Sequence, residues 1–483
     1  MIFLKDSIVI CQVSVRTSGM KERMGNAGLD KKAAYSGQMQ EAAPYSRTGK
    51  LGVNPALFFE DLFLRHGDFV HYRGLMEFYA INHPALIKQV LNETHRHFDK
   101  QTPIYDRFRN ALGNSLVNAE GRHWKRQRKL LQPVFRSDSI RDFFRTMADA
   151  CETHTERWDQ CASDGKTLWL ADEFAEVTLR MAGQCLFSSA FDSAADDIRR
   201  WTRTINTYSS IPPLRVLNNP RVPTYFNLKL RRVLKEYREF LRALIEERLT
   251  DPSRNENDLL TVFLSMKDEE TNEPMSLIEV SDEVLGMIIG GHESGSTALT
   301  WTIFQLQRHP EIEAEVVAEI DRVSGGKPLR LEQIPELVLT ERVIQEAMRL
   351  HPPLWFENRN ALEDAEIQGI RVPRGSVIAI SRYSLHRNPE FWEAPGEFIP
   401  GRFDPEDTEH YVDSKSAGTY LPFSRGPRVC IGRHFAMMQM VLVVATLLSR
   451  YRVRAEPPLD DAFTAHLTIN LKSRLPVRLE RRT

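Results

Sequence analysis

Residues 423–432 read Phe-Ser-Arg-Gly-Pro-Arg-Val-Cys-Ile-Gly, so two glycines and a proline surround a single cysteine, Cys430. The apolar stretch from Phe435 to Leu448 follows and predicts a long helix. A cysteine just before a helix N-terminus lies near aligned amide dipoles, which favour the thiolate form. A thiolate at this place is a nucleophile, a redox sensor or a metal ligand, whereas a lone cysteine is more often a buried residue of a loop.

The spacing Phe-x-x-Gly-x-Arg-x-Cys-x-Gly is matched at every fixed position of this stretch. It resembles the signature of the cytochrome P450 heme-thiolate monooxygenases, and the resemblance covers roughly Pro44 to Arg478. It implies a mainly α fold with small β-sheets. In that fold the cofactor, heme b, lies between a long central helix and the helix that follows the cysteine.

The same resemblance implies a role for several residues of the stretch. Cys430 is the expected axial ligand of the heme iron, and a thiolate ligand donates electron density that favours O–O cleavage. Arg428 is expected to meet a heme propionate. Phe423 and Gly432 are expected to shape the pocket around the sulfur.

Trp124 and Arg128 are four residues apart on a predicted helix. Their indole N–H and guanidinium therefore face the same way and could grip one carboxylate. The alternative is a basic, solvated helix face. The resemblance implies that both are propionate ligands, and Arg359 resembles a further propionate arginine of the family.

Glu346 and Arg349 are three residues apart on another predicted helix, so their charges can pair. Taken alone, such a pair is usually a solvated surface bridge. The resemblance implies instead that the pair is buried and bonded to a further arginine, here Arg402. The three residues would then form a structural triad that holds the heme-binding loop, because a buried charge needs its partners.

A long helix is predicted from an N-cap near Ser281 to about Arg308, a length of about 40 Å. Residues 290–291 are Gly-Gly and weaken it by ~1 kcal/mol per glycine. Close packing on a neighbouring helix is one explanation. The resemblance implies another, namely an acid and an alcohol that relay protons during oxygen activation. Glu293 matches the acid, and Ser294 stands in place of the usual threonine, so these two are the expected catalytic residues.

The resemblance also suggests which residues wall the substrate pocket, and these are mostly apolar. They are Met287, Gly290, Gly291, Leu354, Phe356 and Leu467. A segment with four prolines, Ser209 to Pro223, is expected to form a lid. A hydrophobic small molecule of medium size is therefore the expected substrate.

Shorter patterns set the organisation of the chain. A helix is predicted over Pro55–Arg65, and paired strands over 69–72 and 77–80. Residues 1–43 are mostly polar and predict a flexible N-terminal extension. No linker divides the remainder, so residues 44–483 are predicted to form a single heme-thiolate monooxygenase domain.

The 483 residues include 64 basic and 65 acidic side chains, a net charge of −1, which argues against nucleic-acid binding by bulk electrostatics. Five cysteines without regular spacing predict reduced thiols. The apolar stretch Ser7–Val15 is much shorter than the ~20 residues that span a bilayer, so no membrane anchor is expected. A cytoplasmic monomer is the consistent prediction.

The chain ends soon after the region of resemblance, so electrons are expected from a separate ferredoxin or flavodoxin with its reductase. Basic residues near the proposed propionate ligands and the cysteine are expected to form its docking face, although a solvated face is the alternative. These residues are Arg122, Lys125, Arg126, Lys129, Arg136, Arg425 and Arg433.

The predicted function is a monooxygenase that uses dioxygen to hydroxylate or epoxidise an apolar organic molecule, in secondary metabolism or in lipid or terpenoid oxidation. A peroxygenase or an oxidative C–N or C–C coupling enzyme of the same fold is the alternative, and a heme-thiolate gas or redox sensor comes after it. The Glu293–Ser294 pair favours dioxygen, because a peroxide-driven enzyme does not need that relay.

Overall fold

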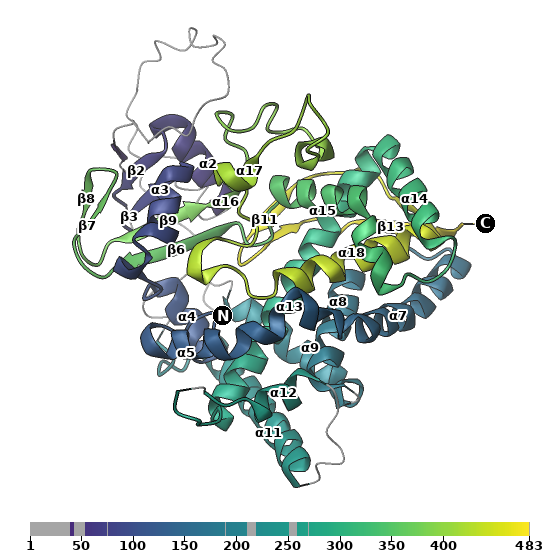
Figure 1. Ribbon diagram of the computed structural model, residues 1–483, viewed down its shortest axis with the longest axis horizontal. Helices are drawn as coiled ribbons and strands as arrows, with labels where there is room; N and C mark the ends of the chain where they lie inside the picture. The colour runs from purple at the N-terminus through teal and green to yellow at the C-terminus, as the bar shows by residue number, and fades with distance from the viewer. Residues whose placement is uncertain are drawn as a thin grey trace.

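The chain folds mainly into α-helices, and its largest sheet lies at one side of the molecule (Figure 1). The predicted fold class is therefore confirmed. The computed structural model describes residues 39–42, 54–74, 76–188, 190–209, 219–250, 258–268 and 270–482. Most of the predicted extension, and residues 210–218 of the predicted lid, lie outside these described residues. Within them, no helix combines the length and apolar character that crossing a membrane requires.

The helices account for most of the described chain. The α-helices are α2 (Pro55–His66), α3 (Pro84–Lys88), α4 (Pro103–Leu112), α5 (Gly121–Leu131), α6 (Ser137–Arg141), α7 (Phe144–Asp164), α8 (Leu170–Phe187), α9 (Ala190–Ser209), α11 (Tyr225–Thr250), α12 (Leu259–Ser265), α13 (Leu277–Arg308), α14 (Pro310–Ser324), α15 (Val338–Leu350), α16 (Arg382–Leu385), α17 (Ser414–Ala417) and α18 (Arg433–Arg450). Short turns of other helical types are η1 (Gln89–Glu93), η2 (His95–His97), η3 (Gln132–Phe135), η5 (Leu331–Glu336), η6 (Pro400–Phe403) and η7 (Gly426–Arg428). The helices predicted at Pro55 and after the cysteine are thus found as α2 and α18.

The strands form one larger and three smaller sheets within the described residues. The larger sheet has six strands in the order β1-β2-β3-β9-β6-β4, with β1 (Gln40–Ala42), β2 (Phe69–Tyr72), β3 (Phe78–Ile81), β4 (Phe98–Asp99), β6 (Phe356–Ala361) and β9 (Val377–Ser381). The smaller sheets contain β5 (Leu168–Trp169), β7 (Ala365–Ile367), β8 (Ile370–Val372), β10 (Tyr451–Ala455), β11 (Phe463–Ala465), β12 (Ile469–Leu471) and β13 (Pro476–Arg481). The predicted pair of strands is confirmed, because β2 and β3 pair antiparallel.

The first strand lies inside the predicted extension. Gln40–Ala42 pair in parallel with β2, with Gln40 opposite Val70. This pairing satisfies backbone groups that would otherwise be left at the edge of the sheet. The sheet therefore begins a few residues before the boundary predicted at residue 44.

The central helix α13 begins earlier than predicted. Ser276 is its N-cap, because the Ser276 hydroxyl accepts from the Glu279 N–H (3.2 Å) and the Glu279 carboxylate accepts from the Ser276 N–H (2.7 Å). This reciprocal capping box satisfies two amide groups at the helix start. The prediction of Ser281 as the N-cap was wrong. At 1.5 Å per residue, the 32 residues of α13 span about 48 Å.

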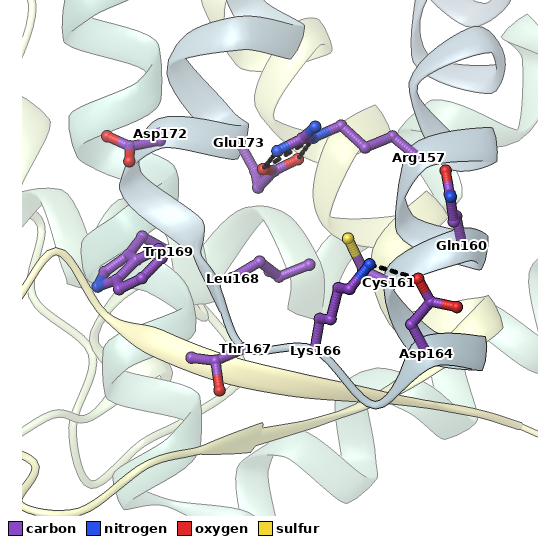
Figure 2. A pocket seen from close by; sticks show the side chains of 10 residues that line it. All are labelled: Arg157, Gln160, Cys161, Asp164, Lys166, Thr167, Leu168, Trp169, Asp172 and Glu173. Atoms are coloured by element: carbon purple, nitrogen blue, oxygen red, sulfur yellow. Dashed lines mark hydrogen bonds and ion pairs between the residues drawn. The ribbon is translucent and has the colours of Figure 1, made fainter.

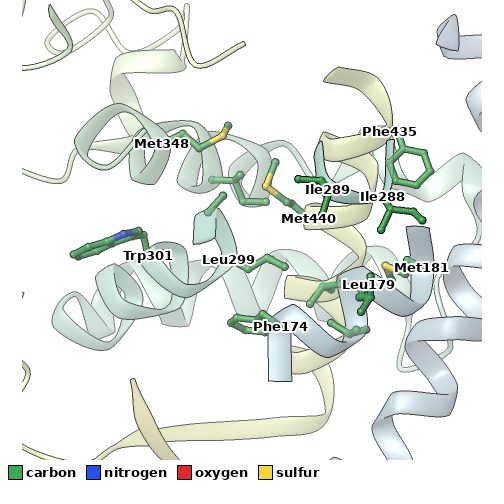
Figure 3. Close-up of a cluster of buried hydrophobic side chains, with 14 of the residues drawn as sticks. Phe174, Leu179, Met181, Ile288, Ile289, Leu299, Trp301, Met348, Phe435 and Met440 are labelled. Carbon is green, nitrogen blue, oxygen red and sulfur yellow. The ribbon is translucent and has the colours of Figure 1, made fainter. Parts of the chain in front are cut away.

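The hydrophobic core surrounds α13, which packs against α8, α15 and α18. Figure 3 shows Trp301 of α13 in this region, together with Phe174 of α8, Met348 of α15 and Met440 of α18. The Trp301 indole is fully buried and stacks on the His351 ring at 3.5 Å. These contacts fix the position of α13 relative to the segment that follows α15.

Candidate active site

The cysteine loop, residues 423–432, leads directly into α18. The backbone N–H of Cys430 donates to the carbonyl of Phe423 at 2.9 Å and closes the loop. Gly426 has a φ of +76°, and a Cβ at this position would collide with the carbonyl oxygen of Leu91. Only glycine meets both conditions. The loop therefore holds Cys430 at the start of the helix.

Residue Cys430 is exposed, but protein atoms surround its sulfur. This poor solvation raises the pKa of the Cys430 thiol, whereas the Gly432 N–H and the guanidinium of Arg128 act to lower it. The amide groups at the helix start thus act in the predicted direction, but poor solvation outweighs them. A metal ion at the sulfur would favour the thiolate again.

Helix α5 brings two of the predicted residues against the cysteine loop. Arg128 Nη1 donates to the carbonyl of Val429 at 2.9 Å. The Arg428 guanidinium lies over the Trp124 ring, 3.9 Å from the ring centroid, and pairs with Glu120. The structure therefore brings Trp124, Arg128 and the loop together, with each α5 side chain contacting a different loop residue.

Three cations gather beside the cysteine loop: Arg428, Arg359 of β6 and Lys100, which follows β4. Arg359 pairs with Glu357 at 3.1 Å. Burial, and then the positive charges of Arg359 and Arg428, bring the pKa of Lys100 well below its usual range. Glu357 and Glu120 oppose this effect without overcoming it. The cluster is therefore electrostatically suited to an anionic ligand. Lys100 was missed in the sequence, where no motif marks it.

Glu346, Arg349 and Arg402 meet in a buried network. Arg349 donates to both carboxylate oxygens of Glu346, at 2.7 and 2.8 Å, and Arg402 Nε donates to Glu346 Oε1 at 3.3 Å. Arg349 also donates to three backbone carbonyls between residues 386 and 397, at 2.8–2.9 Å. The network thus fastens α15 to the segment that leads toward the cysteine loop.

The centre of α13 separates the side chains of the predicted acid–alcohol pair. Ser294 Oγ donates to the carbonyl of Gly290 at 2.9 Å, within its own helix. Glu293 Oε1 accepts instead from Thr468 Oγ1 at 2.9 Å, on the turn between β11 and β12. Burial raises the pKa of Glu293, and the bond from Thr468 opposes this. Gly290 is exposed, with no atom within 4 Å of an added Cβ, so α13 has open space here.

The other residues predicted to wall the substrate pocket lie in different surroundings. Met287, Phe356 and Leu467 are half-buried, and Leu354 is exposed. Gly291 instead faces α8, where an added Cβ would make an ordinary contact, 3.7 Å from a side chain of that helix. The pocket-wall role of all these residues stays a prediction.

The model of one protein family, described as Cytochrome P450, matches residues 47–475. The chain belongs to the cytochrome P450 family. This P450 is 33% identical over 420 residues to the "Pentalenene oxygenase" of Streptomyces avermitilis, across 86% of this chain and 91% of that protein. It is 32% identical over 397 residues to the "Cyclooctatin synthase" of Streptomyces melanosporofaciens, across 81% and 84%. The solved "cytochrome P450DA heme domain" shares its fold, with a TM-score of 0.78, 24% identity, and coverage of 91% of this chain and 97% of that one.

The P450 family is one of heme-thiolate enzymes, and the residues of this site fit that cofactor. Cys430 offers a sulfur on an exposed residue at the start of α18. The cations beside the loop suit the two carboxylates of a heme, and an anion bound there would favour the charged form of Lys100. The open face at Gly290 leaves room on α13. The site thus offers a sulfur for the heme iron, cations for the propionates and space beside α13 for the ring.

A cavity of about 830 Å³ lies on the flank of α13 where Glu293 is found. Residues of α8, α9, α11, α13 and the β11–β12 region line it, and both polar and apolar side chains contribute. They include Leu179, Thr202, Asn206, Phe226, His292, Thr297, Ile469 and Asn470. Glu293 therefore connects the central turn of α13 to a partly polar cavity in this P450.

A smaller pocket of about 310 Å³ lies between α7 and the start of α8 (Figure 2). Arg157 and Glu173 face each other there at 3.0 Å, and Lys166 pairs with Asp164 at 2.7 Å. These charged groups neutralise one another. The pocket is built from other elements than the cysteine loop and α13.

Proposed function

We propose that this P450 is a monooxygenase that inserts one atom of dioxygen into a C–H or C=C bond of a cyclic terpenoid. The observation that carries the proposal is the likeness to three Streptomyces proteins at 32–33% identity. They are named pentalenene oxygenase, cyclooctatin synthase and cyclooctat-9-en-7-ol 5-monooxygenase. The half-buried apolar side chains of Met287 and Phe356 support an apolar substrate.

In this proposal Cys430 ligates the iron, and cations bind the propionates. When bound, the heme supplies the oxygen-activating chemistry, which a thiolate ligand favours. The proposed propionate ligands are Trp124, Arg128, Arg359 and Arg428, and Phe423 and Gly432 shape the pocket around the sulfur. Glu293 takes up and releases protons, and Ser294 keeps a hydroxyl lone pair as an acceptor.

The test is to add pentalenene and cyclooctat-9-en-7-ol to the ferric holoenzyme and follow the low- to high-spin absorbance change. We expect at least one of them to bind and, when an electron donor supplies two electrons and labelled dioxygen is present, to give a product that carries one labelled oxygen atom. Product formed from peroxide alone, without label from dioxygen, would establish the peroxygenase alternative. Failure of both compounds to bind would refute the proposed substrate class.

We further propose Lys100 as a heme-propionate ligand that the sequence motifs do not reveal. Its Nζ donates to the carbonyl of Val117 at 2.9 Å and lies 5.0 Å from the Tyr105 ring centroid. No carboxylate is bonded to this Nζ among the described residues, so its remaining donors are available to an anion. A charged hydrogen bond to a propionate would relieve the cost of burying Lys100.

Lys100→Met is expected to release heme faster, by roughly tenfold or more, since it removes a charged hydrogen bond. The measurement is heme transfer from the holoenzyme to excess apomyoglobin. Lys166→Met, at an exposed lysine of the small pocket, should leave the transfer rate unchanged. The apoprotein of Lys100→Met should melt no lower than wild type, because a buried cation has been removed. Unchanged heme release with a less stable apoprotein would show that Lys100 is structural.

For electron supply we propose a cytoplasmic ferredoxin or flavodoxin that docks beside α5 and the start of α18. The exposed cations of this surface are Arg122, Lys125, Lys129, Arg136 and Arg433. Arg126 is bonded to Glu279 at 2.6 Å, Lys129 lies near a carboxylate, and Arg425 is half-buried. The docking surface is therefore smaller than the sequence predicts.

Lys125→Glu is expected to slow reduction by an acidic ferredoxin by about tenfold at low salt, because association is steered by charge. The same charge change on α11, Lys229→Glu, is the matched control and should have little effect. The measurement is the rate of heme reduction at increasing ionic strength. Equal effects of the two variants would contradict docking at α5.

A further inference from the structure

The β11–β12 turn reaches α13 through a chain of side-chain hydrogen bonds. Thr468 Oγ1 donates to Glu293 Oε1 at 2.9 Å, and Asn470 Nδ2 donates to Thr468 Oγ1 at 2.8 Å. Thr297 Oγ1 in turn donates to Asn470 Oδ1 at 3.0 Å. The chain begins and ends on α13, one turn apart, so it closes into a ring across the two elements.

The turn itself is held rigidly against its neighbours. The Trp301 indole N–H donates to the carbonyl of Ile469 at 2.9 Å, and the Ile469 N–H donates to the carbonyl of Pro353 at 3.1 Å. Thr468 is only 1% exposed. Its hydroxyl is therefore a fixed donor rather than a mobile surface group.

The two oxygens of Glu293 have different surroundings. Oε1 is held by Thr468, whereas Oε2 is buried and has no hydrogen-bond partner among the described residues. A buried oxygen without a partner is costly, so its retention calls for an explanation. One held oxygen and one available oxygen make a carboxyl group that can exchange a proton without changing its orientation.

We propose that Thr468 is the positioning residue for Glu293. Its hydroxyl fixes one carboxyl oxygen and leaves Oε2 to take up and release protons during oxygen activation. This inference rests on the proposed monooxygenase function. It assigns a task to the β11–β12 turn, which neither the cysteine motif nor the residues of α13 reveal.

Among the described residues, Thr468 supplies the side-chain hydrogen bond to the Glu293 carboxylate. The charged and titratable side chains that line the same cavity come from α8, α9, α13 and the C-terminal region: Asp172, Glu176, Arg199, Arg203, His292, His466 and Arg474. Two of these arginines are paired with the two carboxylates. Burial raises the pKa of Glu293, and the bond from Thr468 is the effect that lowers it. Loss of that bond should therefore raise this pKa further.

The test compares Thr468→Val, which keeps the shape and loses the hydroxyl, with Thr468→Ser, which keeps the hydroxyl. Thr464→Val is the matched control on the same hairpin, since the Thr464 hydroxyl lies 3.5 Å from a backbone carbonyl of Asn470. Infrared titration of the ferric holoenzyme follows the carboxyl band that Glu293→Gln removes. We expect Thr468→Val to raise the pKa of Glu293 by about one unit, and the other two variants to leave it near wild type.

The second readout is oxygen uptake and peroxide release with a ferredoxin donor and pentalenene, measured against pH. We expect Thr468→Val to be roughly tenfold slower, with a larger share of peroxide and a pH profile shifted upward, and Thr468→Ser to restore the wild-type profile. Wild-type turnover and pH profile in Thr468→Val would overturn the positioning role. No oxygen uptake by wild type would instead refute the proposed function, while the infrared shift would still report the Thr468–Glu293 contact.

Discussion

Replacement of Cys430 by alanine is expected to abolish product formation and the red-displaced band of the ferrous carbonyl complex. Both depend on a thiolate ligand to the heme iron, and no other group of the cysteine loop can supply one. The fold should survive, because Cys430 is an exposed residue and its main-chain bond to Phe423 does not involve the side chain. The measurements are the absorbance spectrum of the carbonyl complex, the heme content, and product yield with an electron donor.

Cys161→Ala is the control for this variant. Cys161 lies on α7, beside the small pocket, and is half-buried. Its replacement should leave both the spectrum and the product yield unchanged. A Cys430→Ala variant that kept the red-displaced band would show that another cysteine ligates the iron and would refute the site.

Replacement of Arg349 by leucine is expected to lower the free energy of unfolding by about 3–5 kcal/mol, because Glu346 would keep its buried charge without its main partner. Arg349 also lies over the Trp392 ring, 5.0 Å from its centroid, so packing is lost as well. Arg349→Lys keeps the charge but cannot make the paired bonds to the carboxylate, and it should lose an intermediate amount. The measurement is chemical denaturation followed by tryptophan fluorescence and heme absorbance.

The matched control is Arg232→Leu on α11. Arg232 is 81% exposed at its side chain and bonds Glu236 at 2.9 Å, so the pair is solvated. Exposed pairs contribute about 0–1 kcal/mol, and the control should change stability by no more than this. Equal losses in Arg349→Leu and Arg232→Leu would contradict a structural role for the triad.

The cysteine loop and the Glu346–Arg349 pair could be predicted because each is local in the sequence. The loop needs its glycines where the chain turns, and the pair needs a spacing of three on one helix. Contacts between distant segments have no such signature. Thr468 meets Glu293 across 175 positions, and Lys100 comes near Arg428 because Glu120 accepts from the backbone N–H of Lys100 and pairs with the Arg428 guanidinium.

The start of α13 shows why a local pattern can mislead. Ser281 is followed by Asp282 and Glu283, which looks like an N-cap with an acidic first turn. In the structure these two carboxylates accept from the backbone N–H groups of Asn114 and Leu116, at 2.8 and 3.0 Å. They fasten the loop after α4 to the side of the helix. Asp282 and Glu283 therefore make tertiary contacts. In the sequence alone, they look the same as the acidic first turn that follows an N-cap.

Helix α5 is bonded both to the first turn of α13 and to the cysteine loop. Arg126 bonds Glu279 in the first turn of the central helix, and Arg128, two residues later, bonds the carbonyl of Val429 next to the cysteine. Any tilt of α5 strains both bonds together. A protein that binds the outer surface of this helix and shifts it would therefore act on the loop that holds Cys430 and on the first turn of α13 at the same time.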